Sequence, residues 1–524
     1  MLKKNYIPYI FAFFLCIISF VVLFPLLQPG FIKTDDAAWM VIRLTSFYQS
    51  LADGQFPVRF LGRLNQNYGY PVANFLYPGF LYLGSALHIA KIPFQNSVEI
   101  IMAGSVIAGA FGLFFWLQLF FGPLASFIGA STFLFSPYLL YDLYKRGSVG
   151  ELLATGVAML TLFIVEKRWR ILVPFCIFIL LISHNTLALV FSLFFFIYIV
   201  VKKEFSFLVP MAIGVMMSSF FWIPAFFERS FVRFNELSVS NPFDFFGISF
   251  MLFYTSIPFL LGLIYMVVHR KKEYTKENWF FIITFLVAGF FALPISGIFW
   301  KLPILSQFFQ FPYRWYALWL IVGPWLVGSM IESFREKEKF ISIAVIGVIC
   351  VLTSYGFLTK AKSEVHEEGY YTTNEATTTV ADEYMPKWVI EKPEKRSNEK
   401  LEFFDGRGVF LNTEISTKKI VTKIKAEEDS IIQINTVFYP GWGATLDGKP
   451  VEVSGQNPRG LMHILVPKGE HLLFVEFRET VFRFIADVLS AIGFITYGIF
   501  ILLFLLHGKF QKHKSISYLK DVWS

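Results

Sequence analysis

The chain has 524 residues, of which 55% are hydrophobic and only 16% are charged, and its formal net charge is +8. Its mean hydropathy is +0.57, and its 65 Phe, 23 Tyr and 12 Trp are more apolar bulk than the surface of a water-soluble protein can hide. A cytosolic enzyme, a nucleic-acid-binding protein and a disulfide scaffold are therefore excluded. The three cysteines, Cys16, Cys176 and Cys350, all lie inside apolar runs and are interpreted as small core residues.

The first apolar run starts close to the N-terminus, behind Lys3 and Lys4, and extends from Ile7 to Leu27. It is longer than the roughly 7–15 residues of a signal-peptide core, and no small-residue cleavage site follows it. The run predicts a retained first membrane span with its N-terminus in the cytoplasm.

Basic residues cluster between the later apolar runs, around 167–170, 202–203, 270–276, 335–339 and 509–514. The positive-inside rule assigns these clusters to the cytoplasm. The assignment predicts twelve spans with both termini inside: 7–28, 98–119, 122–140, 151–166, 171–184, 186–201, 206–226, 248–268, 279–298, 313–332, 340–358 and 482–506.

One further apolar stretch, 75–90, contains the break Tyr77–Pro78–Gly79. If it crossed the membrane, the basic clusters that follow it would lie on the outer side, against the positive-inside rule. The topology of the later loops therefore argues against a full crossing. We interpret it as a re-entrant or interfacial segment.

The expected fold class is an α-helical polytopic membrane protein with an extracytoplasmic β-rich domain near its C-terminus. Residues 1–358 form the transmembrane domain, with a first outer loop at 29–97. Residues 359–480 form the β-rich domain, because alternating apolar runs are separated by turn signals such as Pro440–Gly441 and Asp447–Gly448, typical of a small antiparallel sandwich. Residues 481–506 are the last span, and 507–524 are a basic cytoplasmic tail.

Two adjacent carboxylates, Asp35 and Asp36, come directly after the first span. Ionised carboxylates side by side near a membrane interface are costly unless they bind a cation, a cationic group or a reacting proton. The alternative is that they only mark the start of a solvated loop.

The segment from Tyr144 to Glu151 carries Lys145 and Arg146 at the outer end of the third span, where the positive-inside rule disfavours basic residues. This placement indicates a specific role, and the alternative is a structural pair of Arg146 with Glu151. His184 lies at the next outer turn, where it is either a hydrogen-bonded hinge or part of a site.

Arg314 starts the tenth span within Gln310–Phe311–Pro312–Tyr313–Arg314–Trp315. A proline and two flanking aromatic residues would hold its guanidinium near the interface, at the depth of a lipid phosphate. Snorkelling of the side chain is the alternative.

Signatures of other function classes are missing from the sequence. It has no Walker A run, no GxGxxG after a strand, no HExxH and no CxxC. Most spans also lack Asp and Glu, which argues against an ion-coupled transporter.

The Asp pair after the first span, the long first outer loop and the Arg146–Glu151 pair together resemble the GT-C superfamily of glycosyltransferases. The first loop, with Asn67–Tyr68–Gly69–Tyr70–Pro71, and the segment Gln310–Arg314 resemble bacterial membrane proteins labelled "6-pyruvoyl-tetrahydropterin synthase-related". The segments 438–442, 447–449 and 467–471 are similar to the outer β-domain of YfhO-type proteins.

The resemblance favours Asp36 as the loop aspartate, because Arg43 follows it by seven residues. Those relatives carry a His four positions after this Asp, where the present chain has Met40. Any role of that His in binding metal or substrate is therefore not carried over to this chain.

The resemblance implies an inverting glycosyltransferase in the bacterial plasma membrane. It would transfer a sugar from a polyprenyl-phosphate donor, bound with its lipid tail among the spans, to an acceptor in the cell envelope, either a wall polymer or a glycolipid. Two rivals stay open: a lipid-linked saccharide flippase or exporter, and a non-catalytic envelope scaffold.

The implied roles begin with Asp36 as general base, with Asp35 assisting it or holding a divalent cation such as Mg²⁺ or Mn²⁺. Arg314, and second Arg146, would stabilise the leaving phosphate. The remaining expected members of the substrate pocket are Glu151, His184, Tyr77 and Tyr313.

Overall fold

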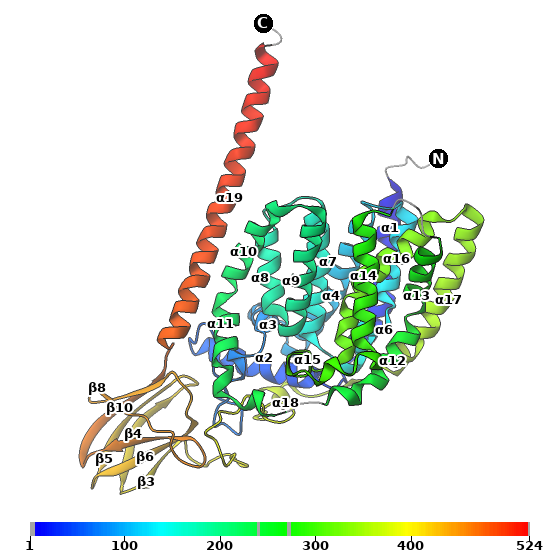
Figure 1. Ribbon diagram of the computed structural model, residues 1–524. Helices are drawn as coiled ribbons and strands as arrows, with labels where there is room; N and C mark the ends of the chain where they lie inside the picture. Colours follow the sequence, from blue (N-terminus) through cyan, green and yellow to red (C-terminus); the bar gives the residue numbers. More distant parts are fainter. Residues whose placement is uncertain (1–5, 238–240, 270–273, 522–524) are drawn as a thin grey trace.

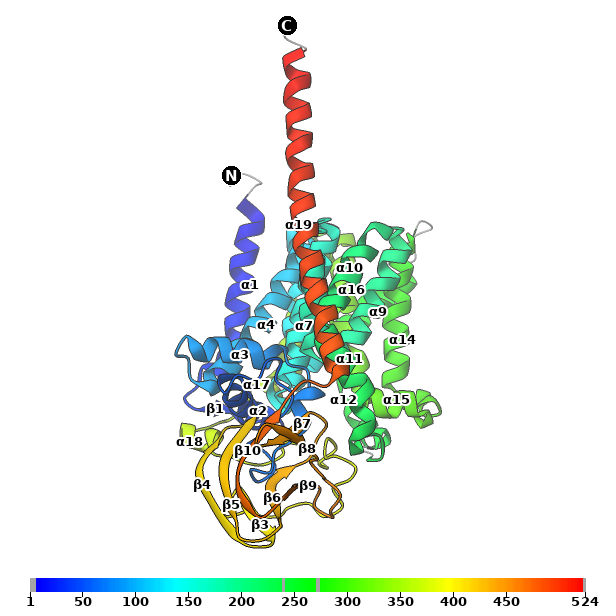
Figure 2. The same cartoon turned by 90° about the vertical axis from the view of Figure 1, so that its left-hand side faces the viewer.

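The computed structural model describes residues 6–237, 241–269 and 274–521, with side chains described as far as Leu506. A body of helices carries a β-sheet domain at one end, and both termini point to the opposite end (Figures 1 and 2). The fold is therefore α-helical with a β-rich domain near the C-terminus, as the composition and patterning predict.

The helical body is built from the helices α1 to α17. They are α1 (Ile7–Leu23), α2 (Ala37–Ala52), α3 (Gly79–Ile89), α4 (Phe94–Leu117), α5 (Pro123–Leu134), α6 (Pro137–Tyr141), α7 (Val149–Glu166), α8 (Val173–Ser183), α9 (Asn185–Lys202), α10 (Leu208–Met217), α11 (Ser219–Phe227), α12 (Phe246–Thr255), α13 (Ile257–Val268), α14 (Lys276–Ala292), α15 (Pro303–Phe308), α16 (Trp319–Ser333) and α17 (Glu336–Lys360). Helix α18 (Glu368–Thr372) follows, and α19 (Val481–Asp521) comes after the β-domain.

Seven helical segments in the described part of the chain are long and apolar enough to cross a membrane, and two bent pairs raise the number to nine. The bent pairs, α10 with α11 and α12 with α13, turn by 66° and 65°. The count of twelve expected spans is higher because it includes three helices, α8, α14 and α16, of 11, 17 and 15 residues. Helices of this length fall short of a hydrocarbon core of about 30 Å.

The apolar stretch 75–90 forms α3, a helix of 11 residues. At 1.5 Å per residue it is about 16 Å long, roughly half of the hydrocarbon thickness. It lies with α2 at the end of the body that carries the β-domain (Figures 1 and 2). Helix α3 is therefore too short to cross the hydrocarbon core of a membrane by itself.

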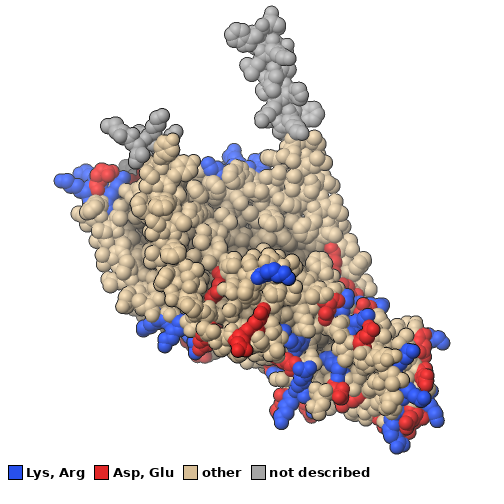
Figure 3. Space-filling model, turned by 180° about the vertical axis from the view of Figure 1, so that it is seen from behind, with Lys and Arg blue, Asp and Glu red and all other residues tan. Residues whose placement is uncertain are grey.

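Charged residues gather at the two ends of the body. Figure 3 shows them along the upper edge and over the lower part with the β-domain, with a broad band of other residues between. At the C-terminal ends of α7 and α9, Lys202 contacts Glu166 at 2.6 Å, and Arg168 pairs with Glu204. The basic clusters at 270–273 and 509–514 lie outside the residues whose side chains are described.

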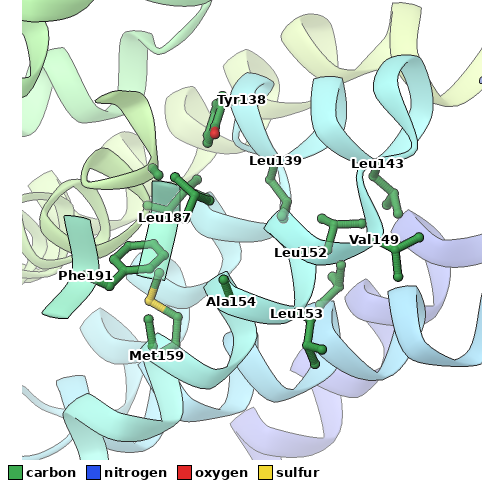
Figure 4. Packing of buried hydrophobic residues seen from close by; sticks show 14 of the residues in the cluster. Tyr138, Leu139, Leu143, Val149, Leu152, Leu153, Ala154, Met159, Leu187 and Phe191 are labelled. Atoms are coloured by element: carbon green, nitrogen blue, oxygen red, sulfur yellow. The ribbon is translucent and has the colours of Figure 1, made fainter. Parts of the chain in front are cut away.

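The core of the body is formed by apolar side chains of the central helices. Figure 4 shows Leu139 of α6, Leu152 of α7 and Leu187 of α9 packed within this cluster. All three are at most 2% exposed. Glu151, which precedes Leu152 in α7, is also buried, at 0% exposed.

The β-domain consists of eight antiparallel strands in two sheets. They are β3 (Leu401–Asp405), β4 (Gly408–Ile415), β5 (Lys419–Ala426), β6 (Ser430–Val437), β7 (Trp442–Leu446), β8 (Lys449–Val451), β9 (Leu461–Val466) and β10 (Gly469–Phe477). One sheet has the order β4-β5-β10-β7-β8 and the other β3-β6-β9. Buried residues alternate along β5, as expected for a strand with one face on a core. A separate short pair joins β1 (Phe31–Ile32) to β2 (Ser363–Glu364).

A buried ion pair joins the β-domain to the helical body. Arg483, at the start of α19, is 0% exposed and donates from Nε and Nη2 to the carboxylate of Glu228 at 2.9–3.0 Å. The Tyr439 hydroxyl, from the β6–β7 connection, donates to Glu228 Oε2 at 3.1 Å, and the Asn74 amide donates at 2.7 Å. One carboxylate therefore holds three segments that are far apart in the sequence.

Candidate functional site

The loop that carries the two aspartates is bound to the connection between α6 and α7. The backbone N–H of Asp35 donates to the carbonyl of Lys145 at 2.9 Å, and that of Asp36 donates to the carbonyl of Arg146 at 2.8 Å. Asp36 then forms the N-terminal boundary of α2. Two expected site segments that are remote in the sequence thus lie side by side.

This close approach depends on Gly147. Its φ of +68° is left-handed, which disfavours residues with a side chain. A Cβ at this position would lie 2.1 Å from the Thr34 hydroxyl oxygen. Glycine therefore allows both the turn that ends the Asp142–Arg146 segment and its contact with the aspartate loop.

The two aspartates have different surroundings. Asp35 pairs with Lys145 at 2.6 Å, and the two side chains are 49% and 59% exposed. Asp36 is 29% exposed, and its Oδ2 lies 3.9 Å from Arg146 Nη2. Asp36 thus has one side toward solvent and the other toward a nearly buried guanidinium.

Glu151 is the centre of a buried charged cluster. It is 0% exposed, and its Oε1 lies 2.5 Å from Arg146 Nη1 and 3.0 Å from both Nε and Nη2 of Arg314. Its Oε2 accepts a hydrogen bond from the Tyr138 hydroxyl at 3.0 Å. His184 Nε2 lies 3.6 Å from Oε1. The expected pair of Arg146 with Glu151 is present, and it is part of a larger group.

Asp142 is a member of the cluster that the sequence reasoning missed. Its Oδ1 accepts from Arg146 Nη1 at 3.0 Å, and the residue is 2% exposed. Asp142 begins a single π-helical turn, Asp142–Arg146, an irregularity that occurs often at functional sites. The i, i+4 spacing of Asp142 and Arg146 was the available signal.

Aromatic rings hold both guanidinium groups in place. The Phe311 ring lies 4.7 Å from the Arg314 guanidinium carbon and 5.3 Å from that of Arg146. Tyr313, 1% exposed, stacks on Phe311 at 5.2 Å and lies 5.6 Å from Arg146. Arg314 Nη1 also donates to the Phe309 carbonyl at 2.7 Å and to the Gln310 side chain at 3.0 Å. The two arginines are thereby fixed in orientation.

His184 has the hinge role that its position indicates and also faces Glu151. Its Nδ1 accepts the backbone N–H of Leu187 at 3.1 Å, which caps the start of α9. The centroid of the Tyr77 ring lies 4.8 Å from that of the imidazole. A Cβ on Gly150 would lie 2.1 Å from Cε2 of Tyr77, so glycine leaves room for the tyrosine ring. Burial raises the pKa of Tyr77 to about 12, so its hydroxyl is neutral at physiological pH.

The structure brings together all eight expected site residues from the first loop, the 142–151 connection, the His184 turn and the 310–314 segment. Arg43, used to align the loop, is buried in α2, and its charge opposes the rise in the pKa of Tyr77 that burial causes. Arg43 also donates to the Thr378 hydroxyl at 2.8 Å and so binds α2 to the chain that enters the β-domain. The roles of the eight residues stay predictions.

Both aspartates already lie beside a basic side chain, which leaves little room for a metal ion. Lys145 forms an ion pair with Asp35, and the Arg146 guanidinium faces Asp36. Within the described residues, no group of three or more His, Cys, Asp or Glu side chains is arranged to hold a metal ion. A protein-only metal site does not fit here.

Comparison with known proteins gives no family assignment. No family model matches the chain, and no curated protein matches it. Among solved structures, the arabinofuranosyltransferase AftD from Mycobacteria is similar over 70% of this chain and 28% of its own, with 15% identity and a TM-score of 0.45. The apo oligosaccharyltransferase of Archaeoglobus fulgidus is similar over 71% of this chain and 57% of its own, with 11% identity and a TM-score of 0.45. The same enzyme in complex with Zn and sulfate is similar over 69% of this chain and 53% of its own, with 11% identity and a TM-score of 0.41. The chain thus spans between about a quarter and about half of these proteins.

Proposed function

We propose that the protein is an inverting membrane glycosyltransferase of the GT-C kind that uses a polyprenyl-phosphate sugar. The single observation that carries the proposal is the placement of Asp36. Its carboxylate is partly exposed at 29% and lies at the edge of a buried cluster that contains two arginines. A base beside fixed cationic groups is what glycosyl transfer from a phosphate requires.

The proposed step starts with the acceptor hydroxyl oxygen, which attacks the anomeric carbon of the donor sugar. The bond from that carbon to the phosphate oxygen breaks, and its electron pair leaves with the lipid phosphate. The hydroxyl proton passes to the Asp36 carboxylate. Attack opposite to the leaving group inverts the configuration at the anomeric carbon.

Negative charge develops on the leaving phosphate, and we propose that the arginines stabilise it. Arg146 is favoured for direct contact, because its Nη2 is the guanidinium nitrogen that reaches toward Asp36, at 3.9 Å. Arg314 keeps its Nη1 on the Phe309 carbonyl and the Gln310 side chain. Glu151 is then a positioning residue, since it holds both guanidinium groups and touches neither reacting atom.

Asp35 and Lys145 lie on the solvent side of Asp36. A divalent cation held jointly by Asp35, Asp36 and a donor phosphate stays a proposal, because Mg²⁺ is commonly bound by one or two carboxylates together with substrate oxygens. It would have to displace Lys145 from Asp35. Transfer that is lost with EDTA and restored by Mg²⁺ or Mn²⁺ supports this cation, and transfer unchanged by EDTA contradicts it.

The acceptor is proposed to be an envelope polymer or glycolipid that approaches from the side of the β-domain, and the compartment is proposed to be the outer face of a bacterial plasma membrane. Tyr77, Tyr313 and His184 would line the sugar pocket, where aromatic rings suit pyranose faces.

The test is a transfer assay with purified protein in lipid nanodiscs, radiolabelled polyprenyl-phosphate sugars and crude wall polymer. Asp36→Asn is compared with the wild type and with Asp244→Asn, an exposed aspartate in the short 3₁₀ helix Pro242–Phe245 outside the site. We expect Asp36→Asn to lower the rate by about 10²- to 10⁴-fold, as the loss of a general base does. Asp244→Asn should leave the rate unchanged.

Full transfer by Asp36→Asn would contradict the assignment of the base. Absence of transfer from the wild type with every donor would favour the flippase or the scaffold. A flippase would then move lipid-linked saccharide across liposomes. A scaffold would do neither and would depend on its β-domain for any phenotype.

A further inference from the structure

A cavity with a volume of about 660 Å³ lies between the helical body and the β-domain, apart from the Glu151 cluster. Its wall is formed by the C-terminal end of α2, the loop residues 62–68, the segments 372–375 and 396–400, and residues of β5, β6 and β7. None of the residues around Glu151 lines it. Its volume falls in the range of about 300–1,000 Å³ that small-molecule sites occupy.

The lining is rich in uncharged hydrogen-bonding side chains, with an aromatic floor. Gln49, Asn398 and Asn435 present amides, and Phe60 and Trp442 pack against each other with ring centroids 5.6 Å apart. Asn435 is held rigidly, since its amide donates to Ser397 Oγ at 2.9 Å and to the Glu399 carbonyl at 2.8 Å. The Asn435 amide is thereby satisfied within the protein, and the exposed amides of Gln49 and Asn398, near the aromatic rings, suit a ligand with many hydroxyl groups.

Three lining side chains have a buried polar atom that finds no partner among the described residues. They are the Thr436 hydroxyl and the Trp442 indole N–H, on residues that are 2% and 7% exposed, and the Arg63 Nε. Buried polar groups in native proteins are nearly always hydrogen-bonded, so three such groups in one cavity wall indicate a missing partner. A polyhydroxylated ligand can both donate to and accept from them.

The charges around the cavity nearly cancel, with no excess of positive charge. Arg396 pairs with Glu375 at 2.8 Å, Lys400 donates to the Asn67 carbonyl at 2.6 Å, and Asp53 accepts two hydrogen bonds from Thr417 at 2.7 Å. The remaining charged lining residues are Arg63 and Glu399, which gives three basic side chains and three carboxylates, and Lys400, whose pKa burial lowers to about 7, is only partly charged at neutral pH. A lining without net positive charge gives a polyanion no electrostatic advantage over a neutral ligand.

Helix α2 connects this cavity to the proposed catalytic site. Asp36 bounds its N-terminal end, and Gln49 and Asp53 line the cavity at its C-terminal end. Its 16 residues span about 24 Å. A single sugar cannot reach both places, whereas a chain of several sugars can.

We propose that this cavity binds a neutral oligosaccharide stretch of the acceptor and so holds the acceptor for transfer at the other end of α2. The acceptor role rests on the proposed function. The binding of a neutral oligosaccharide does not depend on it, and the two are tested separately.

The experiment uses the full-length chain in nanodiscs and isothermal titration with three neutral probes, cellotetraose, maltotetraose and chitotetraose, and one anionic probe, poly(glycerol phosphate). Gln49→Trp fills the cavity and Asn398→Ala removes an exposed lining amide, while Gln456→Ala is the matched control in the β-domain outside the cavity. Asp36→Asn is included to separate binding from catalysis.

We expect at least one neutral probe to bind the wild type. Gln49→Trp and Asn398→Ala should each weaken that binding by about tenfold, equal to about 1.4 kcal/mol. Gln456→Ala and Asp36→Asn should bind as the wild type does. In the transfer assay the two cavity variants should raise the acceptor KM and leave kcat unchanged.

Three results would overturn the proposal: no neutral probe binds, only poly(glycerol phosphate) binds, or neither cavity variant weakens binding. Because Asn398 is exposed, its substitution tests the cavity even if Gln49→Trp fails to fold. Oligosaccharide binding together with full transfer by Asp36→Asn would keep the cavity and reject the assigned base.

Discussion

Arg314 contacts Glu151 across 163 residues of sequence, with its Nε 3.0 Å from Glu151 Oε1. Arg146 reaches the same oxygen at 2.5 Å. One carboxylate oxygen therefore positions both cationic groups that the proposed mechanism uses. Changes at Glu151 should affect the two arginines together, whereas changes at the aspartate loop should leave them in place.

Glu151→Gln keeps the shape of the side chain and removes its charge. The variant leaves two buried guanidinium groups with fewer counter-charges, and we expect a loss of about 3–5 kcal/mol in the free energy of unfolding. The measurement is denaturant unfolding in detergent micelles. Glu336→Gln, whose side chain is 90% exposed, is the control, and should change stability by less than about 0.5 kcal/mol. Equal stability of the two variants would show that the cluster does not depend on this charge.

Gly147→Ala tests the contact between the aspartate loop and the α6–α7 connection. The substitution strains a left-handed backbone by about 1–2 kcal/mol and places a Cβ 2.1 Å from Thr34 Oγ1. We expect transfer activity to fall by at least about tenfold while the helix content stays unchanged. Gly104→Ala, in α4 with no atom within 4 Å of its added Cβ, should keep full activity. Full activity of both variants would contradict a role of the loop position.

Arg483→Met should detach the β-domain from the helical body. It leaves the 4% exposed carboxylate of Glu228 without its cation, at a cost of about 3–5 kcal/mol. We expect faster proteolytic cleavage around residue 480. In the double variant Glu228→Gln/Arg483→Met no charge is left buried, so it should be more stable than Arg483→Met alone. A double variant as unstable as the sum of the single variants would rule out direct coupling.

Lys400 makes stability depend on pH. Burial, with Arg396 nearby, lowers the pKa of Lys400 to about 7, and Glu375 opposes this shift. The unfolded chain, with a pKa of about 10.4, then binds more protons between these values, so stability should rise as the pH rises from 7 toward 10. The measurement is the thermal midpoint at pH 6.5 and pH 9. Lys400→Met should show a smaller rise, and an equal rise in both proteins would contradict the assignment.

The positions of the long helices follow from the sequence because hydrophobic runs bounded by charges are local features. The expected spans 98–119 and 340–358 differ from the observed helices α4 (Phe94–Leu117) and α17 (Glu336–Lys360) by only a few residues at their ends, because the apolar pattern does not fix the first and last turn of a helix. The bends in the pairs α10–α11 and α12–α13 were not predicted. The first bend lies at Ser218–Ser219 and the second at Ser256, two residues before Pro258. Serine pairs and proline are common causes of helix kinks, whereas apolar content carries no record of them.

The members of the candidate site were found one by one from their unusual positions: Asp36 after a span, Arg146 on the wrong side of a span, Arg314 among aromatic residues. Asp142 was missed although it lies four residues before Arg146, because i, i+4 pairs of this kind are common on ordinary helices and do not mark a site. The cavity at the end of α2 was missed for another reason. Its wall combines the first loop with β-strands more than 300 residues later, and sequence spacing carries no information about such contacts.

The sequence by itself indicated a protein with membrane-spanning helices, the places of its long helices and the presence of a β-rich domain. Membrane helices require long apolar runs, and strands with one buried face require alternating apolar residues, and both patterns can be seen along the chain. The tertiary structure alone decided that Arg146 and Arg314 contact one oxygen of Glu151, with Asp36 at the edge of the cluster. Such contacts depend on how helices far apart in the sequence pack, and on a glycine that lets one loop approach another.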